Sequence, residues 1–170
     1  EQLSVFKTAE HTSAYIKVQD GCNQFCSYCI IPYARGRVRS KPLEDLKNEI
    51  SSLEKNGFSE IVLVGINLSA YGMGFDYNIV DAVKLAASFD GIKRVRLGSL
   101  EPDHITYEII DGLTKITKFC PQFHISLQSG CDNTLKRMNR HYNSSEYYNL
   151  CQKLRDSFAG TTITTAIMVG

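Results

Sequence analysis

The sequence lacks several features that would place a protein in a class at once. It contains no run of about 18 apolar residues, so we expect no membrane-spanning helix. Its first residues, Glu1 to Ser4, do not begin a secretory signal peptide. It also has little net charge, because 19 Lys and Arg residues face 18 Asp and Glu residues and leave +1. The total charge therefore neither favours nor excludes a nucleic-acid partner, and any basic surface must be local.

The chain also has no repeat period, low-complexity segment or internal linker. Apolar residues make up 43% and charged residues 22%, proportions typical of a folded globular protein and not of a disordered tail. A length of 170 residues suits one domain, which we expect to span residues 1–170. The chain begins without Met and stops directly after a predicted strand, so we interpret it as a piece of a longer protein.

Cysteine is too sparse for a small disulfide scaffold, in which about 8–10% of residues are Cys. Three of the six Cys lie within eight residues, and the others are scattered. A group of thiols without a secretory signal indicates metal binding before disulfides. The clustered residues are Cys22, Cys26 and Cys29, and the scattered ones are Cys120, Cys131 and Cys151.

Strand-like and helix-like segments alternate along the chain. Alternating β-formers or short apolar runs predict five strands, at residues 13–19, 61–64, 93–97, 123–127 and 162–169. Apolar residues at helical spacing predict four helices, at residues 43–56, 79–89, 105–116 and 147–158. This alternation predicts parallel pairing and right-handed crossovers. We therefore predict an α/β fold, a partial (β/α) barrel that is open on one side and ends after about five parallel strands.

Polar and Cys residues follow the ends of four predicted strands. Function in parallel α/β folds collects in such loops, so we expect these residues to share one rim of the sheet. They are the Cys triplet, then Gly65-Ile66-Asn67, then Ser99, Glu101 and Pro102, and finally Gln128-Ser129-Gly130.

The triplet has the spacing C-x3-C-x2-C, which allows one loop to wrap around a metal centre. Three Cys ligands suit a cubane iron–sulfur cluster in which one iron has no protein ligand and can bind a small molecule. A structural zinc site normally needs four ligands, so zinc would require one from elsewhere in the chain. Reduced structural thiols are the third interpretation.

The residues around the triplet carry a family resemblance. The spacing after a first strand, with Tyr28 just before Cys29, resembles the radical S-adenosylmethionine (SAM) superfamily. The strings Gln19-Asp20-Gly21-Cys22-Asn23 and Cys29-Ile30-Ile31-Pro32-Tyr33-Ala34-Arg35-Gly36 look like those of its methylthiotransferases. The resemblance implies a radical SAM barrel, a 4Fe–4S cluster on Cys22, Cys26 and Cys29, and SAM bound at the open iron. It also implies an N-terminal domain for a second cluster and a C-terminal RNA-binding domain outside this chain.

Shorter strings indicate a branch of that family. Gly65-Ile66-Asn67-Leu68, Tyr71-Gly72 and Leu100-Glu101-Pro102 resemble the enzymes that add a methylthio group to C2 of N6-threonylcarbamoyladenosine 37 of tRNA. The alternatives within the family are isopentenyladenosine 37 of tRNA and an aspartate of a ribosomal protein. Its isopentenyladenosine branch tends to have His before that Pro. Outside the family, the alternative is a metal-stabilised nucleic-acid-binding module without catalysis.

The resemblance also implies roles for residues near the cluster loop. Tyr28 would pack beside the cluster and SAM, and Gly65 would let the backbone approach the methionine amino group. Ser99 and Glu101 would accept hydrogen bonds from that amino group or from the ribose hydroxyls. For Gly65 the alternative is a plain strand-end turn, and for Ser99 and Glu101 a turn or helix cap. No catalytic residue is assigned beyond the cluster.

Gln128 and Ser129 match a family string that lines the SAM pocket, and the alternative is a polar loop. Arg140 would hold the SAM carboxylate or a phosphate, and the alternative is a solvated helix face. One departure from the family is Ala166, where an Asp is usual. That departure puts in doubt any contact expected from the last strand.

A local basic stretch follows the cluster loop, because no acidic residue lies between Asp20 and Glu44. Its cations, Arg35, Arg37, Arg39 and Lys41, suit guidance of an RNA backbone, and the alternative is an ordinary basic loop. The partners implied by the resemblance are the anticodon loop of tRNA and an electron-donor protein, in the cytoplasm and away from membranes.

Overall fold

The computed structural model describes residues 13–169. The strands are β1 (Ser13–Asp20), β2 (Arg39–Ser40), β3 (Glu60–Gly65), β4 (Arg94–Leu97), β5 (Ser99–Leu100), β6 (Gln122–Ile125) and β7 (Thr162–Thr164). The helices are α1 (Ile31–Arg35), α2 (Leu43–Lys55), α3 (Ile79–Ala87), α4 (Tyr107–Thr114), α5 (Asp132–Arg137) and α6 (Ser144–Ser157), with short 3-10 turns η1 (Leu68–Ala70) and η2 (Pro102–His104).

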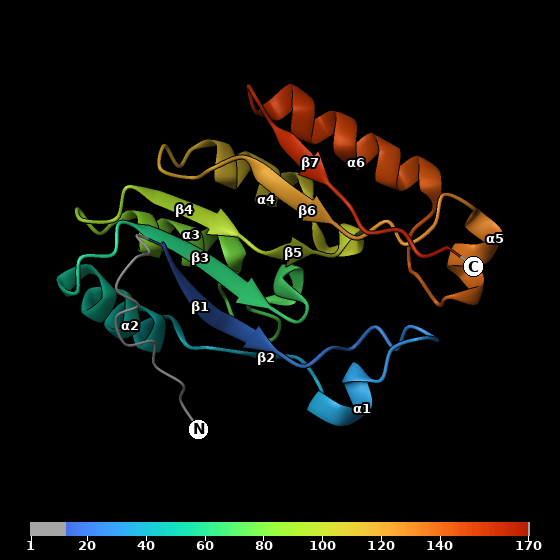
Figure 1. Ribbon diagram of the computed structural model, residues 1–170, viewed down its shortest axis with the longest axis horizontal. Helices are drawn as coiled ribbons and strands as arrows, with labels where there is room; N and C mark the ends of the chain where they lie inside the picture. The colour runs from blue at the N-terminus through green and yellow to red at the C-terminus, as the bar shows by residue number, and fades with distance from the viewer. Residues whose placement is uncertain (1–12, 170) are drawn as a thin grey trace.

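The strands form two hydrogen-bonded groups in the orders β2-β1-β3-β4 and β5-β6-β7. All pairs are parallel except β1 with β2. The groups are joined where Val95 of β4 pairs with Phe119, and where the Gly98 amide donates to the Leu63 carbonyl at 2.8 Å. The result is one curled, largely parallel sheet (Figure 1).

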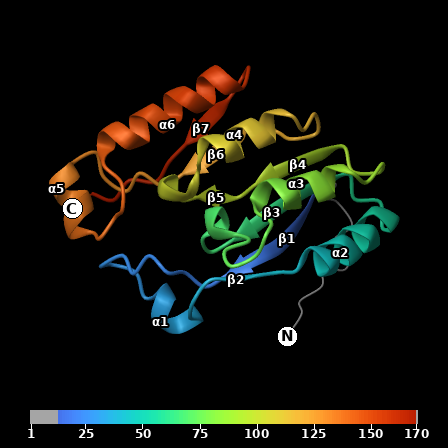
Figure 2. The ribbon, with the colours of Figure 1, turned by 180° about the vertical axis from the view of Figure 1, so that it is seen from behind.

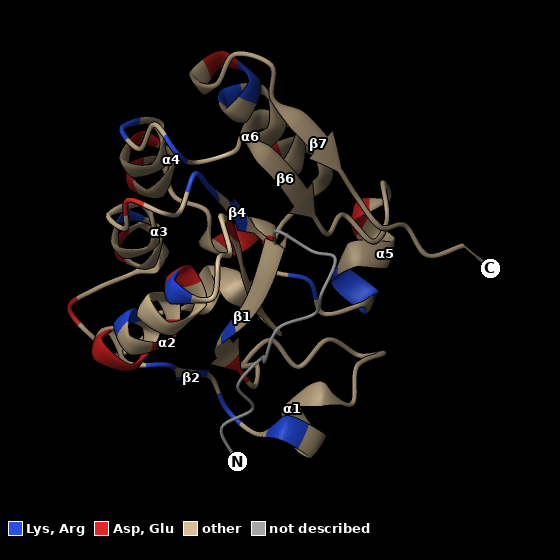
Figure 3. Ribbon diagram, turned by 60° about the vertical axis from the view of Figure 1, so that its left-hand side comes forward, with Lys and Arg blue, Asp and Glu red and all other residues tan. Residues whose placement is uncertain are grey.

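Helices α2, α3, α4 and α6 cover one face of this sheet, as the view from behind shows (Figure 2). Seen from the side, they form an arc around the strands (Figure 3). The core lies between the two layers: Ala14, Ile16 and Val18 of β1 are buried there, whereas Tyr15 and Lys17 between them are exposed. The period of two in β1 therefore directs alternate side chains into the helical layer.

Local sequence signals explain where the long helices begin and end. α2 buries Leu46, Ile50 and Leu53 on one face, and Gly57 follows its end with a φ of 87°. Capping boxes start α3 at Asn78 and α6 at Asn143, where each Asn side chain accepts a backbone amide of the first turn.

The predicted α/β half-barrel is confirmed, and each of the five predicted strands and four predicted helices overlaps an observed element. The last strand is shorter than expected: β7 ends at Thr164, although Ile167 still bridges to Gln128. The sequence does not predict β2, β5, α1 and α5. Two residues are too few to show strand alternation, and the five and six residues of α1 and α5 are too few to show a helical period. β2 also adds an antiparallel edge to the parallel strands.

The parallel strands run toward the end of the molecule at which α1 and α5 lie (Figure 1). The loops that follow β1, β3, β5 and β6 are therefore gathered at one rim. Three of these loops carry the Cys triplet, Asn67 and Glu101.

Candidate functional site

The loop at residues 21–30, called the Cys loop below, starts with a turn that only Gly can make. Gly21 has a φ of 72°, and a Cβ built on it would lie 2.0 Å from the Arg37 carbonyl oxygen. The next residue, Cys22, donates its amide to the Gly36 carbonyl at 3.1 Å. The Cys loop is thus folded back against the segment that follows α1.

Gln19, at the end of β1, joins the Cys loop to the loop after β3. Its side chain is buried and donates to the carbonyls of Asp20 and Gly21, each at 2.7 Å. Its Oε1 accepts the Asn67 amide at 2.7 Å. A Cβ on Gly65 would lie 2.8 Å from that Oε1, so Gly65 has a structural reason to be Gly. Its predicted approach to the SAM amino group stays a prediction.

The three thiols differ in their surroundings. Cys26 is buried, and Cys22 and Cys29 are partly buried. The Sγ of Cys22 accepts the Gln24 amide at 3.4 Å and lies 3.9 Å from the Asn67 Nδ2. Burial raises the pKa of the Cys22 thiol, and these hydrogen bonds only partly oppose the increase. A bound metal would stabilise the Cys22 thiolate, which burial has deprived of stabilising water.

The segment Met138-Asn139-Arg140, called the clamp below, follows α5 and holds the Cys loop at the same rim. The Ser27 amide donates to the Met138 carbonyl at 3.0 Å, and the Asn139 Nδ2 donates to the carbonyls of Gln24 at 3.2 Å and Phe25 at 3.0 Å. Asn139 and Phe25 both have a positive φ, of 56° and 51°. Backbone strain of this kind persists only where surrounding contacts hold it, and it is frequent at functional sites.

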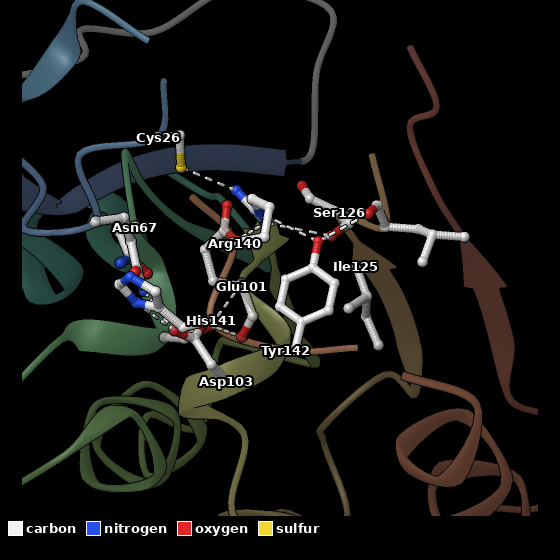
Figure 4. A network of polar contacts seen from close by, with 12 residues as sticks. Cys26, Asn67, Glu101, Asp103, Ile125, Ser126, Arg140, His141 and Tyr142 are labelled. Atoms are coloured by element: carbon white, nitrogen blue, oxygen red, sulfur yellow. Dashed lines mark hydrogen bonds and ion pairs between the residues drawn. The ribbon is translucent and has the colours of Figure 1, made fainter. Parts of the chain in front are cut away.

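Arg140 is the centre of a polar network (Figure 4). Its side chain is 4% exposed and forms an ion pair with Glu101. Its Nη1 donates to the Cys26 Sγ and to the Tyr28 hydroxyl, both at 3.3 Å, and its Nε donates to the Tyr142 hydroxyl at 3.0 Å. Tyr142 in turn donates to the Ser126 carbonyl at 2.7 Å. The guanidinium is therefore fixed from several elements at once.

The ion pair sets the charge of this site. Burial disfavours the charged guanidinium, but the Glu101 carboxylate raises the pKa of Arg140 above its ordinary value. Burial raises the pKa of Glu101, and the neighbouring Arg140 opposes that increase. Burial also raises the pKa of Tyr28 to about 12, so its hydroxyl stays protonated. Arg140 is thus a permanent buried cation beside the Cys26 thiol.

The predicted site residues divide into two groups. Tyr28, Glu101 and Arg140 converge on Cys26. Ser99 is exposed on β5. Gln128 has a φ of 67°, and its backbone pairs with Ala166 and Met168, while the Ser129 Oγ accepts the Cys131 amide at 3.2 Å in the turn before α5. These contacts give Gln128 and Ser129 a structural role, and their SAM contacts stay predictions.

Sequence reasoning assigned no role to three residues that the structure brings to the site. They are Gln19, Asn67 and Asn139. Gln19 and Asn67 lie in quoted motifs, and Asn139 precedes the candidate Arg140. Their partners come from other loops, 48 positions away for Gln19 with Asn67 and 114 for Asn139 with Phe25. The available sequence signal was an amide side chain next to a cysteine motif or a strand end for Gln19 and Asn67, and there was none for Asn139.

Two buried acceptors face this region without a hydrogen-bond partner among the described residues, Asn67 Oδ1 and Asp103 Oδ1. The other Asp103 oxygen accepts the Gln24 Nε2 at 2.6 Å and lies 3.8 Å from the His141 Nδ1. Hollows of about 480 and 490 Å³ flank Asp103, and the residues that line these two hollows do not include the three cysteines. Unpaired buried acceptors of this kind suit a ligand that donates hydrogen bonds.

The donor set fits an iron–sulfur cluster better than a single ion. Among residues 13–169, no three His, Cys, Asp or Glu side chains lie close enough together to hold one metal ion. The thiolates of a cubane bind different irons and need not converge on one point. Three thiols on one loop, with a fixed cation against one of them, are therefore chemically suited to a cluster.

The described part of the chain contains no helix that is both long enough and apolar enough to cross a membrane.

Comparison with known proteins relates the chain to one superfamily. Residues 16–170 match the model of the radical SAM superfamily. The chain is 39% identical over 162 residues to the tRNA-2-methylthio-N(6)-dimethylallyladenosine synthase of Clostridium botulinum (strain Alaska E43 / Type E3), which covers 94% of this chain and 36% of that protein. It is 41% identical over 162 residues to the threonylcarbamoyladenosine tRNA methylthiotransferase MtaB of Thermotoga maritima, covering 95% and 37%. The chain thus spans little more than a third of the length of these relatives.

Solved structures agree on the fold. The radical SAM methyltransferase TsrM of Kitasatospora setae, with cobalamin and a [4Fe-4S] cluster bound, superposes with a TM-score of 0.72 at 18% identity, covering 92% of this chain and 31% of that one. The cobalamin-dependent radical enzyme OxsB, with aqua-cobalamin and SAM bound, gives 0.71 at 12% identity, covering 92% and 24%. At these identities the likeness concerns the fold alone.

Proposed function

Because the chain belongs to the radical SAM superfamily, we propose that it is the radical-generating domain of a tRNA methylthiotransferase. Its reaction would add a methylthio group to C2 of N6-threonylcarbamoyladenosine 37. The observation that carries this proposal is the convergence of Cys26, Arg140, Glu101 and Tyr28 at the rim where the parallel strands end. The proposal also rests on relatives named as tRNA methylthiotransferases at 39–41% identity.

The superfamily implies SAM and a 4Fe–4S cluster as cofactors. We propose that Cys22, Cys26 and Cys29 hold the cluster and leave one iron for SAM. When bound, the cluster supplies the electron that splits SAM and releases a 5′-deoxyadenosyl radical. The chain itself would position the cluster and SAM and would shield the site from water.

Arg140 would stabilise the site electrostatically. A charged donor at 3.3 Å from the Cys26 Sγ would offset the negative charge of a cluster bound to that cysteine. Because the side chain is 4% exposed, water does not screen this effect strongly. The clamp then fixes the Cys loop through carbonyls that neighbour Cys26, so the thiol and the cation keep one relative position.

The remaining predicted contacts concern SAM. One carboxylate oxygen of Glu101 forms the ion pair with Arg140. The carboxylate can also accept hydrogen bonds from the amino group or the ribose hydroxyls of SAM. The unpaired Oδ1 of Asn67 is a further acceptor on the same rim. We keep Gly65, Ser99, Gln128 and Ser129 as proposed members of the SAM pocket.

The choice of modified nucleoside rests on Glu101. Leu100-Glu101-Pro102 resembles the threonylcarbamoyladenosine branch, and MtaB of Thermotoga maritima is one of the relatives at 41% identity. Isopentenyladenosine, also called dimethylallyladenosine, is the second candidate, since several relatives at 36–39% identity have the latter word in their names. Either substrate implies the anticodon loop of tRNA as a partner and an electron-donor protein as another. We propose that the protein works in the cytoplasm, where tRNA is modified.

Nucleoside analysis of tRNA from cells without the gene tests the substrate. The proposal predicts loss of the methylthio group from threonylcarbamoyladenosine, with methylthiolated isopentenyladenosine unchanged. The opposite pattern would move the protein to the second candidate. Normal levels of both modified nucleosides would contradict the function.

A further inference from the structure

The surface formed by the Cys loop, α1 and the segment after α1 combines aromatic side chains, one exposed and one half-buried, with exposed arginines. We call Phe25, Tyr33, Arg35, Arg37 and Arg39 the aromatic–basic patch. Tyr33, on α1, is 73% exposed, and its ring meets the Phe25 ring edge-on with centroids 5.5 Å apart. The Arg37 guanidinium lies over the Phe25 ring, 4.7 Å from its centroid. An aromatic pair with a cation stacked on it is thus presented at the surface.

The patch carries a local excess of positive charge. Arg35 and Arg39 lie 3.8 and 3.5 Å from a single carboxylate, that of Asp20, which Lys17 also contacts at 3.0 Å. Arg37 forms no ion pair with any described residue. Lys41, by contrast, pairs with its own acid, Glu49. The basic stretch therefore presents three arginines, whereas Lys41 is neutralised by Glu49.

The two parts of the patch match the two parts of an unpaired RNA strand. Base rings stack on exposed aromatic side chains, and arginines bind the phosphates between them. Base-paired RNA cannot use the aromatic part, because its bases are already stacked. The patch is also continuous with the proposed radical site, since Phe25 lies between Cys22 and Cys26 and its carbonyl is held by Asn139.

We propose that the aromatic–basic patch binds the unpaired loop of the RNA substrate, with one base stacked on Tyr33 and the backbone on Arg37. The proposal rests on the proposed function, because it names the surface by which that substrate docks. It assigns substrate binding to residues outside the cluster ligands and the Arg140 network.

The test is fluorescence anisotropy with the full chain after cluster reconstitution. The probes are a labelled anticodon stem-loop and a fully paired RNA duplex of equal length. Tyr33→Ala should weaken stem-loop binding by roughly 5- to 150-fold, the range for loss of one stacked base, and should change duplex binding little. Tyr33→Phe keeps the ring and should bind like the unmodified chain. Arg37→Ala should weaken both and lower the salt dependence by about one phosphate contact.

Matched controls lie on α6, on the outer layer. Tyr148 is 59% exposed, and Arg155 is exposed on the same helix, so Tyr148→Ala and Arg155→Ala should leave both affinities unchanged. Iron content and thermal unfolding verify that each variant is folded. Unchanged stem-loop binding by Tyr33→Ala would overturn the proposal, as would equal loss for stem-loop and duplex. If tRNA from cells without the gene lacks the methylthio group but Tyr33→Ala binds the stem-loop normally, only the patch is wrong. If that tRNA carries normal levels of both methylthiolated nucleosides, the proposed function fails first.

Discussion

Arg140 donates a hydrogen bond to the Cys26 Sγ at 3.3 Å, although the two residues lie 114 positions apart. The half-barrel makes this contact possible. It places the Cys loop, which follows β1, and the clamp, which follows α5, at the same rim. Hydrogen bonds from Ser27 to the clamp and from Asn139 to the Cys loop then join the two segments. The first and last thirds of the described chain thus meet at one thiol.

The start of the Cys loop should tolerate no side chain at Gly21. A Cβ there would lie 2.0 Å from the Arg37 carbonyl oxygen, and the φ of 72° alone costs a non-Gly residue about 1–2 kcal/mol. We expect Gly21→Ala to lose most of its iron after anaerobic reconstitution. Gly160→Ala is the matched control, because Gly160 has the same φ of 72° with nothing within 4 Å of the added Cβ. Equal iron contents would show that the turn at Gly21 is not required.

Asn139 should hold the Cys loop in place through its side-chain amide. Its two hydrogen bonds to the Gln24 and Phe25 carbonyls contribute about 0.5–1.5 kcal/mol each. Asn139→Gly keeps the backbone free to adopt a φ of 56° but removes the amide. We expect both Asn139→Gly and Asn139→Ala to lose iron faster than the unmodified chain under a chelator. If Asn139→Gly retains iron normally, the positive φ and not the amide is what matters.

The Arg140–Glu101 pair should be coupled in stability. Removing one partner of a buried pair costs about 3–5 kcal/mol, and the 19% exposure of Glu101 places the expected loss for Glu101→Gln at the lower end. The double variant Glu101→Gln/Arg140→Met should lose less than the sum of the single variants. Urea unfolding of all four proteins measures the coupling, which we expect at about 1–3 kcal/mol. Additive losses would show that the pair does not interact energetically.

The scattered cysteines should differ in reactivity. Hydrogen bonds from the Thr134 amide and side chain lower the pKa of the Cys131 thiol, so more of it is thiolate at neutral pH. Burial raises the pKa of Cys151, which also lies inside α6. Alkylation followed by mass spectrometry should label Cys131 well before Cys151 at pH near 7. Reversal of that order would contradict the placement of α5 and α6.

Sequence periodicity was sufficient to predict the strand and helix layers of the fold, but it could not predict which side chains meet at the rim. Burial of Leu46, Ile50 and Leu53 on one face of α2 is a local property that spacing reveals. The pairing of Glu101 with Arg140 is not, because both were candidates for SAM contacts and only the curled sheet brings them together. Gln19 shows the same limit: its side chain bonds to two loops at once, and no one-dimensional pattern encodes that.

The basic stretch illustrates a different limit. Four cations without an acid in the intervening sequence indicate an open basic surface. In three dimensions Asp20 approaches Arg35 and Arg39, and Glu49 pairs with Lys41. Acids distant in sequence therefore reshape a charge pattern that is uninterrupted along the chain.

Electron paramagnetic resonance of the anaerobically reconstituted and reduced protein, with and without SAM, tests the central claim most directly. The account predicts a reduced 4Fe–4S signal that changes when SAM is added, together with formation of 5′-deoxyadenosine. Cys26→Ala should lose the signal, and Cys131→Ala, which removes an exposed thiol outside the triplet, should keep it. An unchanged signal in Cys26→Ala, or a signal in the unmodified protein that does not respond to SAM, would contradict the account.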